Sequence, residues 1–179
     1  NSVQRYLSYE IGRGDKDRVS RVFNVSIMVH VCIAVLVLIV MECVGLWYLN
    51  NYINIPASRM NAANWAFQCS LIATLVTILQ VPDNAIIISK EKMDFFAYIS
   101  ILEATFKLLI VYALAISAFD KLKLYSVLMA VVTLGVLLMY QLYCKNQFVE
   151  TKLRFTKDWA LFKELVSFSG WNMLSEVAW

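Results

Sequence analysis

Apolar residues fill four long, almost uninterrupted runs along this chain, and charged residues gather between the runs. A helix needs about 20 apolar residues to cross the roughly 30 Å hydrocarbon core of a membrane. Four segments reach this length and are predicted as spanning helices: 25–49, 65–89, 95–119 and 124–144. Apolar and polar residues do not alternate along these segments, so the strands of a membrane barrel are not indicated.

The segments between the runs complete the predicted order of the chain. Residues 1–10 are predicted to end an earlier helix, and residues 11–24 to form a cytoplasmic loop. We predict an outer loop at 50–64, a cytoplasmic segment at 145–161 and the start of a further helix at 162–179. The chain begins without Met and ends inside an apolar stretch, so we expect it to be an internal piece of a longer protein.

The overall composition is typical of a membrane protein. Hydrophobic residues make up 60% of the chain and charged residues 16%, whereas soluble domains average about 45–50% and about 25%. The four cysteines lie in or beside the apolar runs, without a CxxC motif or a Cys/His cluster. We predict that they are packing residues, with neither a disulfide nor a metal site.

Lys and Arg are distributed unevenly between alternate connections, and this predicts the orientation. Cytoplasmic loops of membrane proteins carry an excess of Lys and Arg. Twelve of the 16 basic residues lie in segments 5–21, 90–92 and 145–163, whereas three lie on the opposite side, at Arg59, Lys121 and Lys123. The basic segments are therefore predicted to be cytoplasmic. The first and third spans then run outward, and the second and fourth run inward.

An ion pair is predicted near the middle of the third span. Glu103 and Lys107 are four residues apart on one helix face, with the acid N-terminal to the base. A charge at this depth costs at least about 2.5–3.5 kcal/mol on insertion scales, so such groups face other helices or a wet cavity. Two interpretations stay open: a structural pair within the helix, or a cavity-lining cation that meets an anionic substrate. Exposure to lipid is the least favoured.

Glu42 and His30 add two further ionisable groups to the first span. Glu42 lies towards its outer end, where a carboxylate typically forms hydrogen bonds at the interface or between helices; a role in proton or cation coupling is the alternative. His30 is the only histidine and lies about one turn inside the cytoplasmic edge, so no metal site is predicted. A hydrogen-bonded role in helix packing is favoured over a proton relay.

Pro82 is predicted to bend or interrupt the second span near its cytoplasmic end. Proline removes a backbone donor and crowds the preceding turn, so we expect a bend or a loss of regular helix between about 79 and 84. Asp83 and Asn84 can bond the freed backbone groups or line a gate. A simple kink at the helix end and a functional hinge are both open.

No catalytic or nucleic-acid-binding constellation is found. The sequence has no Ser/His/Asp set, no carboxylate pair in a polar setting and no metal-ligand spacing, and the net charge is only +3. The stretch Gly12–Asp15 is predicted to be a turn between helices. We predict no enzyme activity, no cofactor and no nucleic-acid partner.

Three groups of residues follow the order and spacing of a known family. They are SVQRYLSYEIGRG at 2–14; ECVGLW at 42–47 with IPASR at 55–59 and Ala62-Ala63; and VPDNA at 81–85 with EKM at 91–93, LFKEL at 161–165 and FSGWN at 168–172. Together they resemble the polysaccharide flippase branch (O-antigen and teichoic-acid exporters) of the multidrug/oligosaccharidyl-lipid/polysaccharide exporter superfamily. Asp83 departs from the family pattern, which has an aromatic residue between the proline and the asparagine.

The resemblance implies an all-α polytopic membrane protein with the two-lobed helical bundle of multidrug-extrusion transporters. The chain would run from late helix two to early helix seven, with 145–161 between the lobes. The implied activity is the flipping of an undecaprenyl-pyrophosphate-linked oligosaccharide across the bacterial cytoplasmic (inner) membrane for surface polysaccharide, such as lipopolysaccharide O-antigen. Lys107 could then neutralise the pyrophosphate.

Two other functions stay open. A cation-coupled multidrug exporter of the same fold would use membrane acids such as Glu42. A membrane scaffold of a glycan assembly complex would transport nothing. The implied partners are the lipid bilayer, the lipid-linked oligosaccharide and other glycan assembly proteins.

Overall fold

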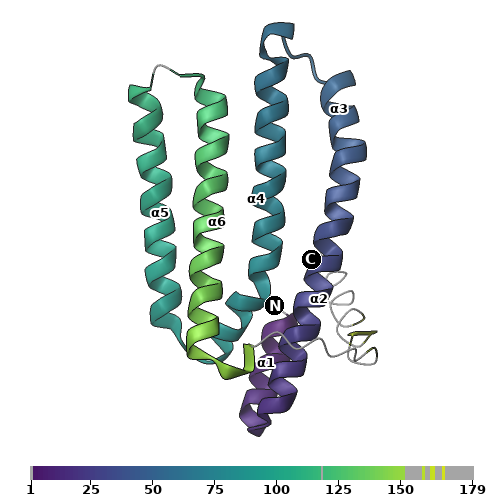
Figure 1. Cartoon of the computed structure of the whole chain (residues 1–179), viewed down its shortest axis with the longest axis vertical. Coiled ribbons are helices and arrows are strands. Elements are labelled where there is room, and N and C mark those ends of the chain that lie inside the picture. Colours follow the sequence, from purple (N-terminus) through teal and green to yellow (C-terminus); the bar gives the residue numbers. More distant parts are fainter. Residues whose placement is uncertain (1, 118, 152–158, 160–161, 164–166, 168–179) are drawn as a thin grey trace, which may run out of the picture. The chain divides into compact units, whose positions relative to one another are not determined.

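Every element of the described chain is a helix. The computed structural model describes residues 2–117, 119–151, 159, 162, 163 and 167 (Figure 1). The elements are α1 (Ser2–Arg13), α2 (Lys16–Val40), the π-helix η1 (Met41–Gly45), α3 (Leu46–Asn51), α4 (Ala57–Ser89), α5 (Met93–Ile116), α6 (Lys121–Gln147) and the short 3₁₀ helix η2 (Val149–Thr151).

Four of these helices are long and apolar enough to cross a membrane. They are Lys16–Asn51, which combines α2, η1 and α3, then Ser58–Ser89, Met93–Ile116 and Lys121–Gln147. Each corresponds to one predicted apolar run, although the helices extend beyond the runs at most ends. The chain is therefore an α-helical protein with four candidate spans in its described part. The predicted segment 145–161 and the predicted helix at 162–179 lie largely outside the described residues.

The segment 11–24, predicted as a loop, is helical except at a tight turn. Gly14 ends α1 in the left-handed conformation, with a φ of 76°, which glycine adopts without steric cost. Asp15 then caps α2, because its Oδ1 accepts a 3.0 Å hydrogen bond from the backbone N–H of Arg18. Val19 and Phe23 are buried on the first turns of α2. Their spacing is helical, but the charged residues at 16–18 and 21 interrupt the apolar pattern, so a search for apolar runs did not find it.

The turn between α4 and α5 is another left-handed helix end. Glu91 has a φ of 56°. Its N–H bonds the carbonyl of Ile88 at 3.0 Å, and the N–H of Lys92 bonds that of Ile87 at 3.1 Å. This pair of bonds satisfies carbonyls that the end of α4 would otherwise leave free. A non-glycine residue in this conformation carries strain, of the order of 1 kcal/mol.

The chain divides into two compact units, and one comprises residues 1–32, 79–96 and 140–179. Its core contains fully buried side chains from α1, α2 and α4, including Leu7, Phe23 and Ile86. The hydroxyl of Ser89 lies 3.1 Å from the carbonyl oxygen of Gln4 and so connects α4 to α1. The core of this unit is thus formed by α1, the first half of α2 and the end of α4.

The other unit comprises residues 33–78 and 97–139. Cys69 of α4, Ile110 of α5 and Val136 of α6 are buried in it. Many other apolar side chains are exposed, such as Leu36 (62%) and Val111 (58%). Contiguous apolar surface of this kind is what a membrane-embedded helix presents to lipid.

Candidate functional site

The mid-span ion pair lies on α5. The Nζ atom of Lys107 is 2.6 Å from Oε1 of Glu103, and the two side chains are 45% and 32% exposed. Ile99 and Ile110 are the buried residues of α5 and mark its packed face. At about 100° per residue, Glu103 lies about 40° from Ile99, and Lys107 about 60° from Ile110. The pair therefore borders the packed face of α5 and does not lie opposite to it.

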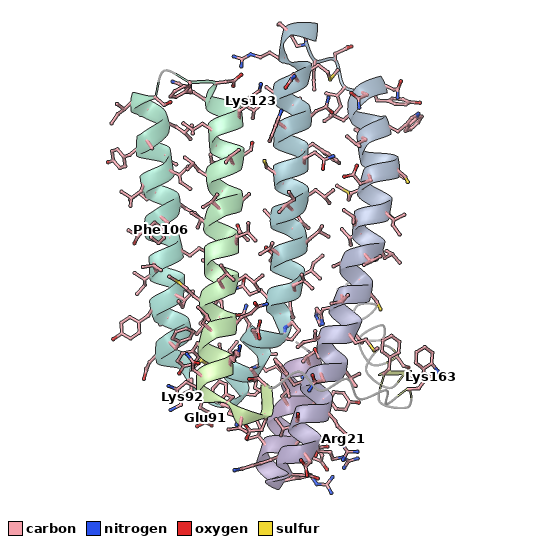
Figure 2. The ribbon with its side chains drawn as sticks, viewed as in Figure 1. Arg21, Glu91, Lys92, Phe106, Lys123 and Lys163 are labelled. Carbon is pink, nitrogen blue, oxygen red and sulfur yellow. The ribbon has the colours of Figure 1, made fainter. Side chains whose placement is uncertain are left out.

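This geometry leaves Lys107 able to bind an anion. Its ammonium group has three N–H donors, and the contact with Glu103 engages one of them. The carboxylate neutralises the ammonium while no ligand is bound, which lowers the cost of holding a charge within the span. Phe106, the neighbour of Lys107 in the sequence, lies near the middle of α5 in Figure 2. The two interpretations of the pair, structural or substrate-binding, are both compatible with this contact.

Glu42 lies in the π-helix η1 and bonds a side chain of α4. Its Oε2 atom accepts a 3.3 Å hydrogen bond from Nε2 of Gln68. Close by, a Cβ atom added to Gly45 would lie 2.7 Å from Cζ of Phe67, so the absence of a side chain permits this approach. Single π turns within α-helices are frequent at functional sites. The partner Gln68 is 26 positions away in the sequence, so periodicity could not identify it.

His30 bonds its own helix. Its Nδ1 atom lies 2.8 Å from the carbonyl oxygen of Ser26, one turn earlier on α2. A carbonyl oxygen only accepts, so Nδ1 carries the proton in this contact and the neutral ring keeps Nε2 as an acceptor. The side chain is half-buried. The packing role of His30 stays a prediction, and the proton relay stays its alternative.

Pro82 lies inside a continuous helix. The predicted loss of regular helix between 79 and 84 is wrong, because α4 is unbroken from Ala57 to Ser89. Proline is tolerated within spanning helices where neighbouring groups bond the freed backbone. Pro82 leaves the carbonyl of Ile78, four residues earlier, without its helical donor. Pro82 and Asp83 are buried, and Sγ of Cys144 lies 3.9 Å from the carbonyl of Asp83. Oδ1 of Asn84 is buried without a hydrogen-bond partner in the described part of the chain. The predicted bend and the hinge role stay open.

A cluster that the sequence did not predict connects the α4–α5 turn to the end of α6. Nζ of Lys90 lies 3.0 Å from Oε1 of Glu150 and 4.9 Å from the centre of the Phe148 ring. The hydroxyl of Thr151 lies 2.8 Å from the carbonyl of Phe148. We call these four residues the Lys90 junction. Lys90 is 60 positions from Glu150, so only the fold brings it to the other three residues.

Electrostatics in the Lys90 junction favour the ionised carboxylate. Burial alone would raise the pKa of Glu150. The hydrogen bonds from its own backbone N–H and from Lys90, with the positive charges of Lys90 and Lys16, outweigh burial and lower the pKa below its ordinary value of 4.5. Glu150 is therefore negatively charged at neutral pH.

Comparison with known proteins identifies no relative: no protein-family model, no curated protein and no solved structure matches the chain. The flippase family thus stays a prediction from the residues quoted above. Among the described residues, no three His, Cys, Asp or Glu side chains gather as metal ligands would.

Proposed function

We propose that this chain provides spanning helices of a flippase that moves a lipid-linked oligosaccharide, of the undecaprenyl-pyrophosphate type, across a bacterial cytoplasmic membrane. The observation that carries the proposal is the Glu103–Lys107 pair at mid-depth on α5. A pyrophosphate is strongly anionic and hard to transfer through hydrocarbon, and a cation held within the span offsets that cost. In this function the pair lines a central cavity between two lobes, where water accompanies the sugar while the lipid tail stays in the bilayer.

The contact between Glu103 and Lys107 implies an order of events in transport. Glu103 neutralises Lys107 in the resting transporter, and the arriving pyrophosphate competes for the ammonium donors. Binding is transient because the carboxylate remains within one helical turn to reclaim Lys107. A site that binds strongly enough to admit a charged group and weakly enough to release it is what conduction through a membrane requires.

Removing both charges tests the role of the pair. The double variant Glu103→Met with Lys107→Met leaves no unpaired charge, so a structural pair should tolerate it. A substrate-binding Lys107 predicts normal expression, lost surface glycan and accumulation of the lipid-linked precursor in the inner leaflet. Lys107→Arg should retain part of the export, because the charge survives with altered geometry. The matched control is Lys123→Met, which removes a cation near the start of α6 (Figure 2). Wild-type export by a well-expressed double Met variant would defeat the proposal.

The direction of flipping rests on the orientation that the Lys and Arg distribution predicts. Asp15 and Asn54 are both exposed, so each can carry a single reactive cysteine in a cysteine-free chain. Asp15→Cys should be labelled only from the cytoplasm and Asn54→Cys only from outside. Labelling of both positions by an impermeant reagent on intact cells would refute the orientation.

A cation-coupled multidrug exporter is the second candidate, and the Glu42–Gln68 bond favours it. A carboxylate at a π turn that bonds a neighbouring helix could exchange that bond for a proton or Na⁺. Glu42→Gln would then abolish drug efflux driven by an ion gradient. If Glu42→Gln exports glycan as the wild type does, and neither of these two proteins exports drugs, the flippase remains as the function.

A further inference from the structure

A cavity of about 620 Å³ lies where α4 and α6 begin, within the unit of residues 33–78 and 97–139. Ile55 precedes α4, Arg59 and Ala63 come from its first turns, and the remaining lining residues lead into α6. Those are Phe119, Asp120, Lys121 and Leu122. The volume falls within the range of small-molecule pockets, about 300–1,000 Å³. Glu103, Lys107 and Glu42 are not among its lining residues.

Two of the polar lining groups, Arg59 and Asp120, are paired with each other. Oδ1 of Asp120 accepts a 3.1 Å bond from the N–H of Leu122 and so caps α6. Oδ2 of the same carboxylate accepts a 3.0 Å bond from Nη1 of Arg59. This bond uses one of the five guanidinium donors, and both side chains remain partly exposed, at 61% for Arg59 and 33% for Asp120. Planar donors and an acceptor are therefore presented side by side.

An exposed aromatic ring lies beside the polar pair. Phe119 is 79% exposed, although it is fully apolar and directly precedes Asp120. Its N–H donates a 3.1 Å bond to Oγ of Ser117, and this turn constrains the residue. The described residues leave most of the phenyl ring uncovered. The ring provides a flat apolar surface next to two planar polar groups.

From this combination we infer that the cavity is a carbohydrate-binding site. A pyranose ring has an apolar face of C–H groups, which stacks on an aromatic ring, and hydroxyl groups at its edge, which pair with planar side chains. Phe119 supplies the first contact, while Arg59 and Asp120 supply the second. Hydrogen bonds to charged groups are the stronger kind. That the bound sugar is the glycan delivered to the outer side rests on the proposed function. Carbohydrate binding by the cavity does not rest on it.

The lining carries two positive charges, Arg59 and Lys121, and one negative charge, Asp120. Asp120 compensates Arg59 and would repel a phosphate, since its carboxylate shares the cavity. Phe119 would contribute nothing to phosphate binding. A neutral ligand that both donates and accepts hydrogen bonds uses all three side chains, so the chemistry of the cavity is matched by a hydroxyl-rich ring.

The test is saturation-transfer NMR on the full chain in lipid nanodiscs. The probes are lipid-free neutral di- to tetrasaccharides that contain hexoses and N-acetylhexosamines, with inorganic phosphate as the competitor. We expect sugar signals that excess phosphate does not displace. Phe119→Leu should weaken binding about threefold or more through loss of the flat ring. Tyr48→Leu, another exposed aromatic outside the cavity lining, is the matched control and should change nothing.

Asp120→Asn separates the two ligand classes by the sign of its effect. Asparagine still caps the helix, so folding is retained. Loss of the charged acceptor should weaken sugar binding, whereas loss of the repulsion should strengthen phosphate binding. The inference is overturned if no sugar of the panel binds, if Phe119→Leu leaves binding unchanged, or if phosphate displaces the sugar and Asp120→Asn strengthens binding. A protein that binds sugar but fails to flip lipid-linked glycan in vesicles contradicts the proposed function and leaves this inference intact.

Discussion

Removing the cation of the Lys90 junction should destabilise the protein, and Lys90→Met is the direct perturbation. The side chains of Lys90 and Glu150 are only 22% and 12% exposed, so the variant leaves a largely buried carboxylate without its partner. Exposed pairs contribute at most about 1 kcal/mol, whereas breaking a fully buried pair costs about 3–5 kcal/mol. The junction lies between these limits, and its cation–π contact with Phe148 is lost as well. We expect a loss of about 2 kcal/mol.

The expected loss converts to a measurable shift in unfolding temperature. For a chain of this size, about 2 kcal/mol corresponds to a decrease in Tm of about 4–8 °C. Cys144 is buried, with 2% exposure, so a thiol-reactive dye reports unfolding when Cys144 is the single cysteine of the full chain in detergent. Lys92→Met is the control: Lys92 is exposed in the same turn (Figure 2), and its replacement should shift the Tm only slightly.

The pH dependence of the Lys90 junction follows from Glu150. Its pKa is lowered in the folded protein, so its ionised form stabilises the fold above the ordinary pKa of 4.5 and this contribution is lost as the pH falls through the folded pKa. The difference in Tm between the wild type and Lys90→Met should therefore be largest at neutral pH and should decrease as the pH falls below 4.5. Equal Tm values at neutral pH, or a difference that does not change with acid, would refute the reasoning.

Four further substitutions test the backbone and packing features. Gly45→Ala should destabilise by about 1–3 kcal/mol, because the methyl group would lie 2.7 Å from Phe67; thermal unfolding measures the loss, and the added change Phe67→Leu should recover part of it. Gly14→Ala should destabilise by about 1 kcal/mol because its φ is 76°, whereas Gly12→Ala, within α1 and with open space around it, should stabilise by about 0.5–1 kcal/mol. Glu91→Gly should raise stability by relieving a φ of 56°, and a lower Tm would contradict that account.

The long apolar runs identified the four candidate spans but not what connects them. A run of apolar residues is enough to predict that a span exists and roughly how long it is, because lipid imposes the same requirement on every residue of the span. The start of α2 at Lys16 was missed because the charged residues at 16–18 and 21 interrupt the apolar run around Val19 and Phe23. Their i, i+4 spacing, with Asp15 as a cap, was the available signal.

Candidate site residues were predictable where their partners are local. Glu103 and Lys107 are one turn apart, so helix geometry alone brings them into contact. The partners of Glu42 and Lys90 come from other helices, and no local pattern encodes which residues face each other there. Pro82 does not interrupt α4, because the buried surroundings of a residue, and not the local sequence alone, determine whether a helix continues.

The π-helix at Met41–Gly45 has a consequence for any future comparison of this protein with its relatives. Its bonds span five residues instead of four, so the turn contains one residue more than an α-helix needs to cover the same stretch. A relative with an uninterrupted α-helix should therefore require a one-residue gap in the alignment between 41 and 45. Without that gap, Trp47 and every position to the end of α3 would be assigned to a face about 100° away from the true one.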